Sequence, residues 1–160
     1  MLGFRRGFIF SVSLSLCFFA SFVTGCASSK PSFPFHHPET EFHEPIYLLE
    51  KVNEIEKQDF ENIHLETLGK DVLSSHHLVV IRQKEELHYH ADHDLSAMVI
   101  KGRGILTVGE HQFGVGPGSS VYIPRGLPHQ VVVQGKGPVA ALVIFTPPFD
   151  GKDMIPVPEK

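Results

Sequence analysis

The sequence has few cysteines, no tryptophan and no excess of basic charge, and these shortages exclude several classes of protein. Two cysteines in 160 residues cannot build a disulfide-rich scaffold or a four-cysteine zinc site. With 14 Lys and Arg against 18 Asp and Glu, the net charge is -4, which argues against nucleic acid as a partner. A hydrophobic content of 42% is too high for a disordered acidic chain. Histidine, in contrast, is abundant at 11 residues, and it is the commonest metal ligand in proteins.

The first 26 residues have the pattern of a secretory signal. Arg5 and Arg6 precede an almost wholly apolar stretch over residues 8–22, which is shorter than the roughly 20 residues of a membrane-spanning helix. The stretch is followed by Val-Thr-Gly-Cys at residues 23–26, which resembles the lipobox of bacterial lipoproteins. The resemblance implies a lipoprotein signal peptide over residues 1–25 and a lipid on Cys26. An ordinary signal peptide and an uncleaved anchor are the alternatives.

The residues after the signal predict a tether and then one domain. Four prolines within residues 26–45 oppose regular structure, so we expect an extended tether from the lipidated cysteine. Its histidines, His36, His37 and His43, are read as incidental. Removing the first 25 of 160 residues would leave 135, and the loss of two arginines would change the net charge from -4 to -6. We therefore expect a domain over residues 46–160, held at the cell envelope and facing the periplasm or the exterior.

The domain reads as all-β. Residues 46–57 place Leu48, Leu49, Val52 and Ile55 on one helical face, which is consistent with a short N-terminal helix packed on the domain edge and equally with an irregular lead-in strand. From His76 onward, short apolar runs alternate with Gly, Pro or charged separators, a pattern that predicts a β-sandwich or a small barrel. The runs are residues 76–83, 87–90, 95–102, 104–109, 111–116, 119–124, 129–135 and 138–145.

Two histidine motifs carry the chemistry. His88 and His90 are two residues apart, a spacing that puts both side chains on one face of a strand. Downstream, Gly118, Pro124, Gly126 and His129 follow the order glycine, five residues, Pro-x-Gly, two residues and histidine. These motifs resemble the two signatures of the cupin superfamily, whose members are small jelly-roll β-barrels. The resemblance implies a barrel core over residues 76–146, with a metal ion bound by His88, His90 and His129.

One position departs from the cupin pattern. The first signature has a glutamate seven residues before a glycine, and counting back from Gly102 gives Leu95. His93 shares a strand face with Leu95 and is the first candidate for a fourth ligand. Asp94 is the second candidate, but it needs a local bulge to point inward. If neither reaches the ion, three histidines remain.

The resemblance implies a divalent transition metal as cofactor: Fe, Zn, Ni, Cu or Mn. Loss of the carboxylate disfavours Mn, which prefers oxygen ligands. The first hypothesis is a metal-dependent enzyme, such as a dioxygenase or isomerase, acting on a small polar metabolite. The alternative is a non-catalytic periplasmic module that binds or senses a small ligand or metal. Expected partners are a small-molecule ligand, the membrane through the lipid on Cys26, and a second copy in a homodimer, but no nucleic acid.

Overall fold

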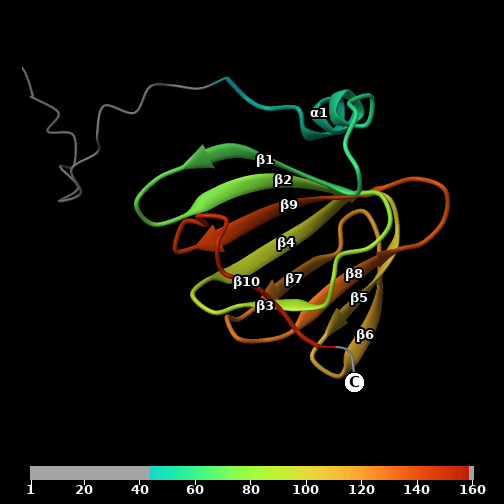
Figure 1. Ribbon diagram of the computed structural model, residues 1–160. Helices are drawn as coiled ribbons and strands as arrows, with labels where there is room; N and C mark the ends of the chain where they lie inside the picture. The colour runs from blue at the N-terminus through green and yellow to red at the C-terminus, as the bar shows by residue number, and fades with distance from the viewer. Residues whose placement is uncertain (1–43, 159–160) are drawn as a thin grey trace, which may run out of the picture. The chain divides into compact units, whose positions relative to one another are not determined.

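The computed structural model describes residues 44–158 of the chain. The predicted signal peptide, the lipidation site Cys26 and nearly all of the predicted tether lie outside these residues. Within the described part, one short helix precedes a series of β-strands (Figure 1). The elements are α1 (Leu48–Ile55), β1 (Ile63–Lys70), β2 (Ser75–Ile81), β3 (His88–His90), β4 (Asp94–Lys101), β5 (Gly104–Val108), β6 (His111–Val115), β7 (Ser120–Ile123), β8 (His129–Val133), β9 (Val139–Thr146) and β10 (Met154–Pro156).

The strands form two antiparallel sheets whose faces oppose each other. The first sheet has the order β1-β2-β9-β4-β7 and the second has the order β10-β3-β8-β5-β6. The central strand β9 pairs with both β2 and β4, so residues distant in the sequence are joined in the middle of the first sheet. In Figure 1 the β1-β2-β9-β4 part of this sheet lies above β3, β8, β5 and β6. The arrangement confirms the predicted all-β jelly roll with a short N-terminal helix.

One apolar core lies between the sheets. Its buried side chains include Val79, Leu95 and Phe145 from the first sheet and Leu106 from the second. Successive residues of a strand point to opposite faces, and these four residues lie on the inward faces of their strands. The alternation of apolar residues therefore determines which face of each strand turns toward the interior.

A second apolar cluster lies on the outer face of the first sheet. Val52 and Ile55 of α1 are fully buried and pack with Leu78, Val80 and Ala140 of β2 and β9. The spacing of three residues puts the two helix side chains on one face, as the sequence predicts. Leu49, which the sequence assigns to the same face, is 55% exposed instead. Because β2 and β9 are covered on both faces, residues 78–81 of β2 form a continuous apolar run instead of an alternating one.

The strand predictions from His76 onward are confirmed within one or two residues at most ends. The hairpin between β5 and β6 turns at Gly109, whose φ of 57° lies in the left-handed region that glycine tolerates. Residues 62–68 alternate only weakly, yet they form most of β1. The sequence reasoning missed β10 altogether.

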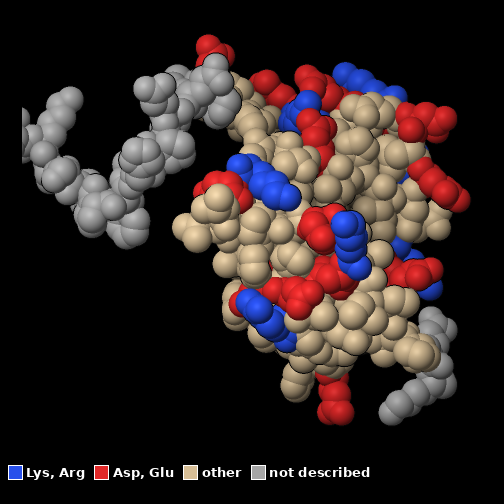
Figure 2. Space-filling view, turned by 60° about the vertical axis from the view of Figure 1, so that its left-hand side comes forward, with Lys and Arg blue, Asp and Glu red and all other residues tan. Residues whose placement is uncertain are grey.

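The unit from His43 to Lys160 is compact, and it includes both sheets and both apolar clusters, so we expect it to fold by itself. Within residues 44–158, no helix has the length and apolar character needed to cross a membrane. Acidic and basic side chains are interspersed on the face seen in Figure 2. The ion pairs of the described residues include Lys51–Glu66 at 2.8 Å and Lys101–Glu56 at 2.7 Å.

Candidate metal centre

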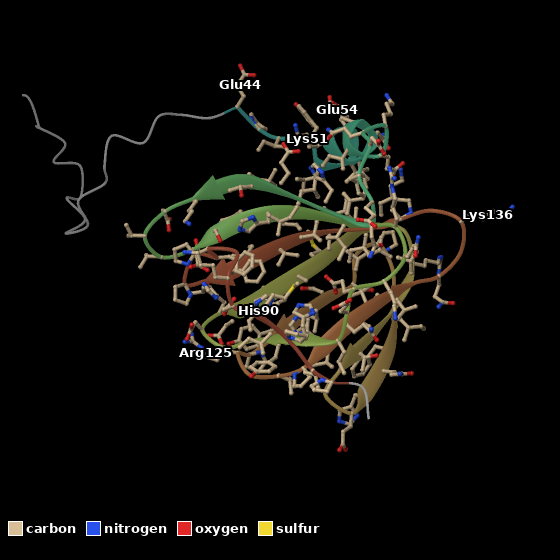
Figure 3. The ribbon with its side chains drawn as sticks, viewed as in Figure 1. Glu44, Lys51, Glu54, His90, Arg125 and Lys136 are labelled. Carbon is tan, nitrogen blue, oxygen red and sulfur yellow. The ribbon has the colours of Figure 1, made fainter. Side chains whose placement is uncertain are left out.

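Three buried histidines meet at the β3–β8 contact. His88 and His90 project from the same face of β3, and His129, the first residue of β8, stands directly opposite His88. The ring centroids are 4.4 Å apart for His88 and His129, 5.1 Å for His88 and His90, and 5.4 Å for His90 and His129. One ring nitrogen from each lies within 4.8 Å of the others. Figure 3 shows His90 at the β3 side of the space between the sheets.

Each of the three rings is oriented from outside by an acceptor at Nδ1. His88 Nδ1 lies 2.7 Å from the Glu86 carbonyl oxygen, and His129 Nδ1 lies 3.0 Å from the Leu127 carbonyl oxygen. His90 Nδ1 lies 3.0 Å from Oδ1 of Asp153. Because these oxygens only accept, Nδ1 carries the proton in each ring, and the lone pair is left on Nε2. Three Nε2 atoms are therefore available to one ion, and such outer contacts are typical of metal-binding histidines.

The histidines are held in the neutral form that can coordinate a metal. Burial lowers the pKa of His88, of His90 and of His129, in the last case to about 4. Hydrogen bonds to Glu86, Asp153 and Leu127 act in the opposite direction but are outweighed. An ordinary histidine has a pKa near 6.5, so at neutral pH protons compete weakly with a metal for these rings.

Asp153 joins the site from the segment after β9. Its Oδ1 accepts from His90, while its Oδ2 accepts from His93 Nδ1 at 2.6 Å and from the Asp92 backbone N–H at 2.9 Å. Burial alone would raise the pKa of this carboxyl, but the hydrogen bonds from His93, the Asp92 N–H and His90 lower it to about 2. Asp153 is therefore an ionised carboxylate that orients His90.

His93 does not join the three-histidine group. Its Nδ1 is bonded to Asp153 and its Nε2 lies 3.3 Å from the Pro148 carbonyl oxygen, so both ring nitrogens have other partners. The residue precedes β4, and the chain there directs the ring toward the segment after β9 instead of toward His88 and His129. The strand phase that made His93 the first candidate for a fourth ligand does not extend to this position.

Asp94, the second candidate, also has another partner. Its carboxylate accepts from the Arg125 backbone N–H at 2.9 Å, from Nε at 3.1 Å and from Nη2 at 3.0 Å. These bonds hold the pKa of Asp94 at about 2 and fasten the turn before β8 to the start of β4. Leu95 does point inward and is 5% exposed. Among residues 44–158, the candidate ligand group thus contains three histidines and no carboxylate.

The histidines line a cavity of about 940 Å³ between the sheets. Its walls are mostly apolar, with Val79, Leu95, Leu106, Val131 and Phe145 among the lining residues. Phe149 also lines it and stacks on Phe145 with ring centroids 4.5 Å apart. An ion at the histidines would be reachable by a small molecule in this cavity.

Sequence reasoning missed two polar residues of this region. Asp153 lies in the segment Pro-Pro-Phe-Asp-Gly-Lys-Asp at residues 147–153, whose second aspartate could have been considered as a partner for a histidine. Glu85, which also lines the cavity, lies in a run of charged residues that reads as a surface turn. Neither has a periodic signal, because each lies between regular strands.

Comparison with known proteins agrees with the fold. The cupin domain family model matches residues 77–145. An uncharacterized protein of Aquifex aeolicus is 36% identical over 97 residues, which cover 61% of this chain and 79% of that protein. A solved structure from Thermus thermophilus has a TM-score of 0.54 at 21% identity, covering 61% of this chain and 95% of that chain. Ectoine synthase from P. lautus has a TM-score of 0.55 at 17% identity, covering 74% of this chain and 92% of that chain.

Two opposed antiparallel sheets with a buried histidine triad between them define a jelly-roll barrel with a candidate metal centre. The chain belongs to the cupin family. The solved structures are too dissimilar in sequence to indicate more than the shared fold.

Proposed function

We propose that this cupin holds one divalent transition metal through Nε2 of His88, His90 and His129. The observation that carries the proposal is the convergence of three buried, neutral imidazoles, each with its Nδ1–H fixed by an outer acceptor. Without an ion, their lone pairs would face an apolar cavity and depend on water for partners. Three nitrogen ligands suit iron, zinc, nickel or copper better than manganese, magnesium or calcium.

The metal would serve an enzyme that acts on a small molecule in the cavity. A bound metal supplies Lewis-acid or redox chemistry, and three protein ligands leave coordination positions open. The protein's own part is to exclude bulk water with the walls around Leu106 and Val131 and to fix the three rings. Because most of the wall is apolar, a polar group of the substrate is best accommodated next to the histidines. Dioxygenase and isomerase chemistry, which the cupin resemblance implies, both fit this arrangement.

The alternative is a non-catalytic module that binds or senses a ligand or the metal itself. It is favoured by Leu95, an apolar side chain at the position where the cupin pattern has a glutamate. A binding module would retain its ligand without turnover, whereas an enzyme would convert it. Analysis of a bound molecule before and after incubation with the metal-loaded protein separates these two outcomes.

Metal analysis tests the centre directly. The unit 43–160 would be purified, stripped with a chelator and reconstituted separately with Fe, Zn, Ni, Cu and Mn. We expect about one tightly bound ion per chain for at least one metal, and loss of that ion in His88→Ala and in His129→Ala. His111→Ala, at an exposed position of β6, is the matched control and should keep the ion. Failure of the wild-type protein to retain any of the five ions would refute the proposal.

We also propose that the protein is attached to the cell envelope through a lipid on Cys26. The support is the order of charged, apolar and Val-Thr-Gly-Cys segments at the start of the sequence. The test is Cys26→Ser in the full chain, followed by membrane fractionation in a bacterial host. The variant should lose lipid labelling and signal processing. Membrane association at the wild-type processed size would contradict the proposal.

A further inference from the structure

Glu85 places a carboxyl group in the wall of the cavity. The residue belongs to the connection between β2 and β3, and it lines the cavity together with apolar side chains of both sheets. Within residues 44–158, no ion pair involves Glu85 and no side-chain hydrogen bond of its carboxyl is found. Glu85 is half-buried, with polar neighbours such as Lys84 and Glu86 as well as apolar ones in the cavity lining. A partly buried carboxyl group without a cationic partner is costly when ionised, so its presence there calls for a functional explanation.

The backbone around Glu85 is firmly attached to β8. The Glu85 N–H donates to the Val131 carbonyl oxygen at 2.9 Å, and Gln130 Nε2 donates to the Glu85 carbonyl oxygen at 2.9 Å. One step further, the Val133 N–H donates to the Gln83 carbonyl oxygen at 2.8 Å. The backbone of this segment is therefore held like a strand although it is not part of a regular one. The Glu85 side chain projects from this fixed backbone.

That position is close to the histidine triad. Val131 comes two residues after His129 on the same face of β8, and two residues of a strand span about 7 Å. The Glu85 backbone is therefore bonded to β8 two residues beyond His129, a candidate metal ligand. A molecule bound next to the histidines in this cavity would share the cavity with Glu85.

The surroundings of Glu85 favour its neutral form. Burial raises the pKa of this carboxyl to about 7, while the Val131 N–H lowers it by a smaller amount. A protonated carboxyl can donate a hydrogen bond, which an ionised one cannot. The other titratable groups that line the cavity are Glu61, Lys84, Glu86, His88, His90 and His129. Of these, the three histidines have lowered pKa values, so they are not expected to gain a proton near pH 7.

We propose that the cavity takes an uncharged molecule with an apolar body and a carbonyl oxygen, to which the Glu85 carboxyl donates a hydrogen bond. The inference rests on the proposed function in that the same cavity takes the substrate. The walls around Val79, Leu106 and Val131 match an apolar body, and about 300–1,000 Å³ is the usual size of a small-molecule cavity. A cationic ligand is disfavoured because Glu85 would have to ionise to pair with it, and this ion pair would have to be desolvated. A divalent metal bound at the histidines would also repel a cation.

Four naphthalenes of nearly equal size test the ligand class. They are 2-acetylnaphthalene, with a carbonyl group; 2-ethylnaphthalene, without a polar group; 1-(2-naphthyl)ethylammonium, a cation; and 2-naphthoate, an anion. The protein has no tryptophan, so binding can be followed by naphthalene fluorescence. The unit 43–160 would be used after chelator treatment, which removes any contribution of a metal to binding of the carbonyl or the carboxylate.

We expect the ketone to bind about tenfold more tightly than the ethyl compound at pH 6, as one buried hydrogen bond allows. The ketone should bind about tenfold more weakly at pH 8 than at pH 6, because Glu85 loses its proton in between. Glu85→Gln, which keeps a donor but does not titrate, should retain binding and lose the pH dependence. Glu85→Leu should abolish the preference for the ketone. Glu61→Gln, at an exposed position of the cavity lining, is the matched control and should behave like wild type.

Two kinds of result would overturn the proposal. One is tighter binding of the ammonium or the naphthoate than of the ketone at pH 6. The other is equal binding of the ketone and the ethyl compound, or binding of neither. Because these measurements use metal-free protein, they can fail while the reconstituted protein still binds its ion, and the reverse also holds. Repeating the ketone titration after metal loading should move the midpoint to lower pH, since a nearby cation favours the ionised carboxyl.

Discussion

Asp153 Oδ1 accepts a hydrogen bond from His90 Nδ1 at 3.0 Å although 63 residues separate them in the chain. The contact exists because β10, which follows Asp153, pairs with β3 in antiparallel register, with Met154 opposite His90. A strand of only three residues thus brings a carboxylate behind a candidate metal ligand.

Removing this carboxylate should weaken the metal site without removing a ligand. We expect Asp153→Ala to lower metal affinity about 10–100-fold, the usual effect of losing an outer partner of a ligating histidine. Asp153→Asn, which keeps an acceptor for one histidine, should have a smaller effect. Competition with a coloured chelator measures the affinity, and Asp150→Ala, exposed in the same segment, is the control. Equal affinities for wild type and Asp153→Ala would show that Asp153 has no part in orienting His90.

Restoring a carboxylate at residue 95 should complete a four-ligand site. Leu95→Glu would place an oxygen ligand at the inward position that the cupin pattern gives to glutamate, so manganese should bind more tightly relative to zinc. In metal-free protein the buried carboxyl should cost about 1–3 kcal/mol of unfolding free energy. Thermal unfolding with and without metal measures both effects. A variant destabilised equally with and without metal would show that residue 95 cannot reach the ion.

Glu85 should make stability fall as the pH rises. Its pKa is about 7 in the folded protein and near the ordinary 4.3 in the unfolded chain. The folded state therefore holds the proton more strongly, and the resulting stability is complete below about pH 4 and is lost as the pH rises to about 7. The difference in unfolding free energy between Glu85→Gln and wild type should shift by about 3 kcal/mol in favour of the variant from pH 4 to pH 8. Urea unfolding of metal-free protein measures it, and a constant difference would indicate an ordinary, solvated carboxyl.

The helix cluster should contribute strongly to stability. Ile55 is fully buried between α1 and the first sheet, so Ile55→Ala should cost about 2–5 kcal/mol of unfolding free energy. Leu49 on the same helix is 55% exposed, and Leu49→Ala should change the stability by less than about 1 kcal/mol. Chemical unfolding compares the two variants. Similar losses would mean that the buried face of α1 is not the one described.

The sequence predicts the strands from His76 onward because glycine and proline mark their ends and apolar residues mark their inward faces. It also predicts the triad, since the spacing of His88 and His90 and the second motif determine where these rings lie. It cannot predict β10, which is too short for alternation to be recognised and ends in Pro156. The partner of His93 depends on the turn before β4, where strand periodicity no longer applies. Asp94 is the first residue of β4 and, as periodicity predicts, points to the face opposite Leu95, but its partner Arg125 comes from a turn that the pattern does not place.

The two apolar clusters lie on opposite faces of β2 and β9, and only the inner one borders the cavity. Substitutions on the inner face alter the shape of the cavity, whereas those on the outer face alter how α1 is held. The apolar cluster beneath α1 can therefore contribute folding stability that the interior, which holds the cavity, does not supply. This separation would let related chains acquire different ligand preferences by exchanging inward-facing residues such as Val79 or Ala141, while the layer beneath α1 keeps the sheet folded.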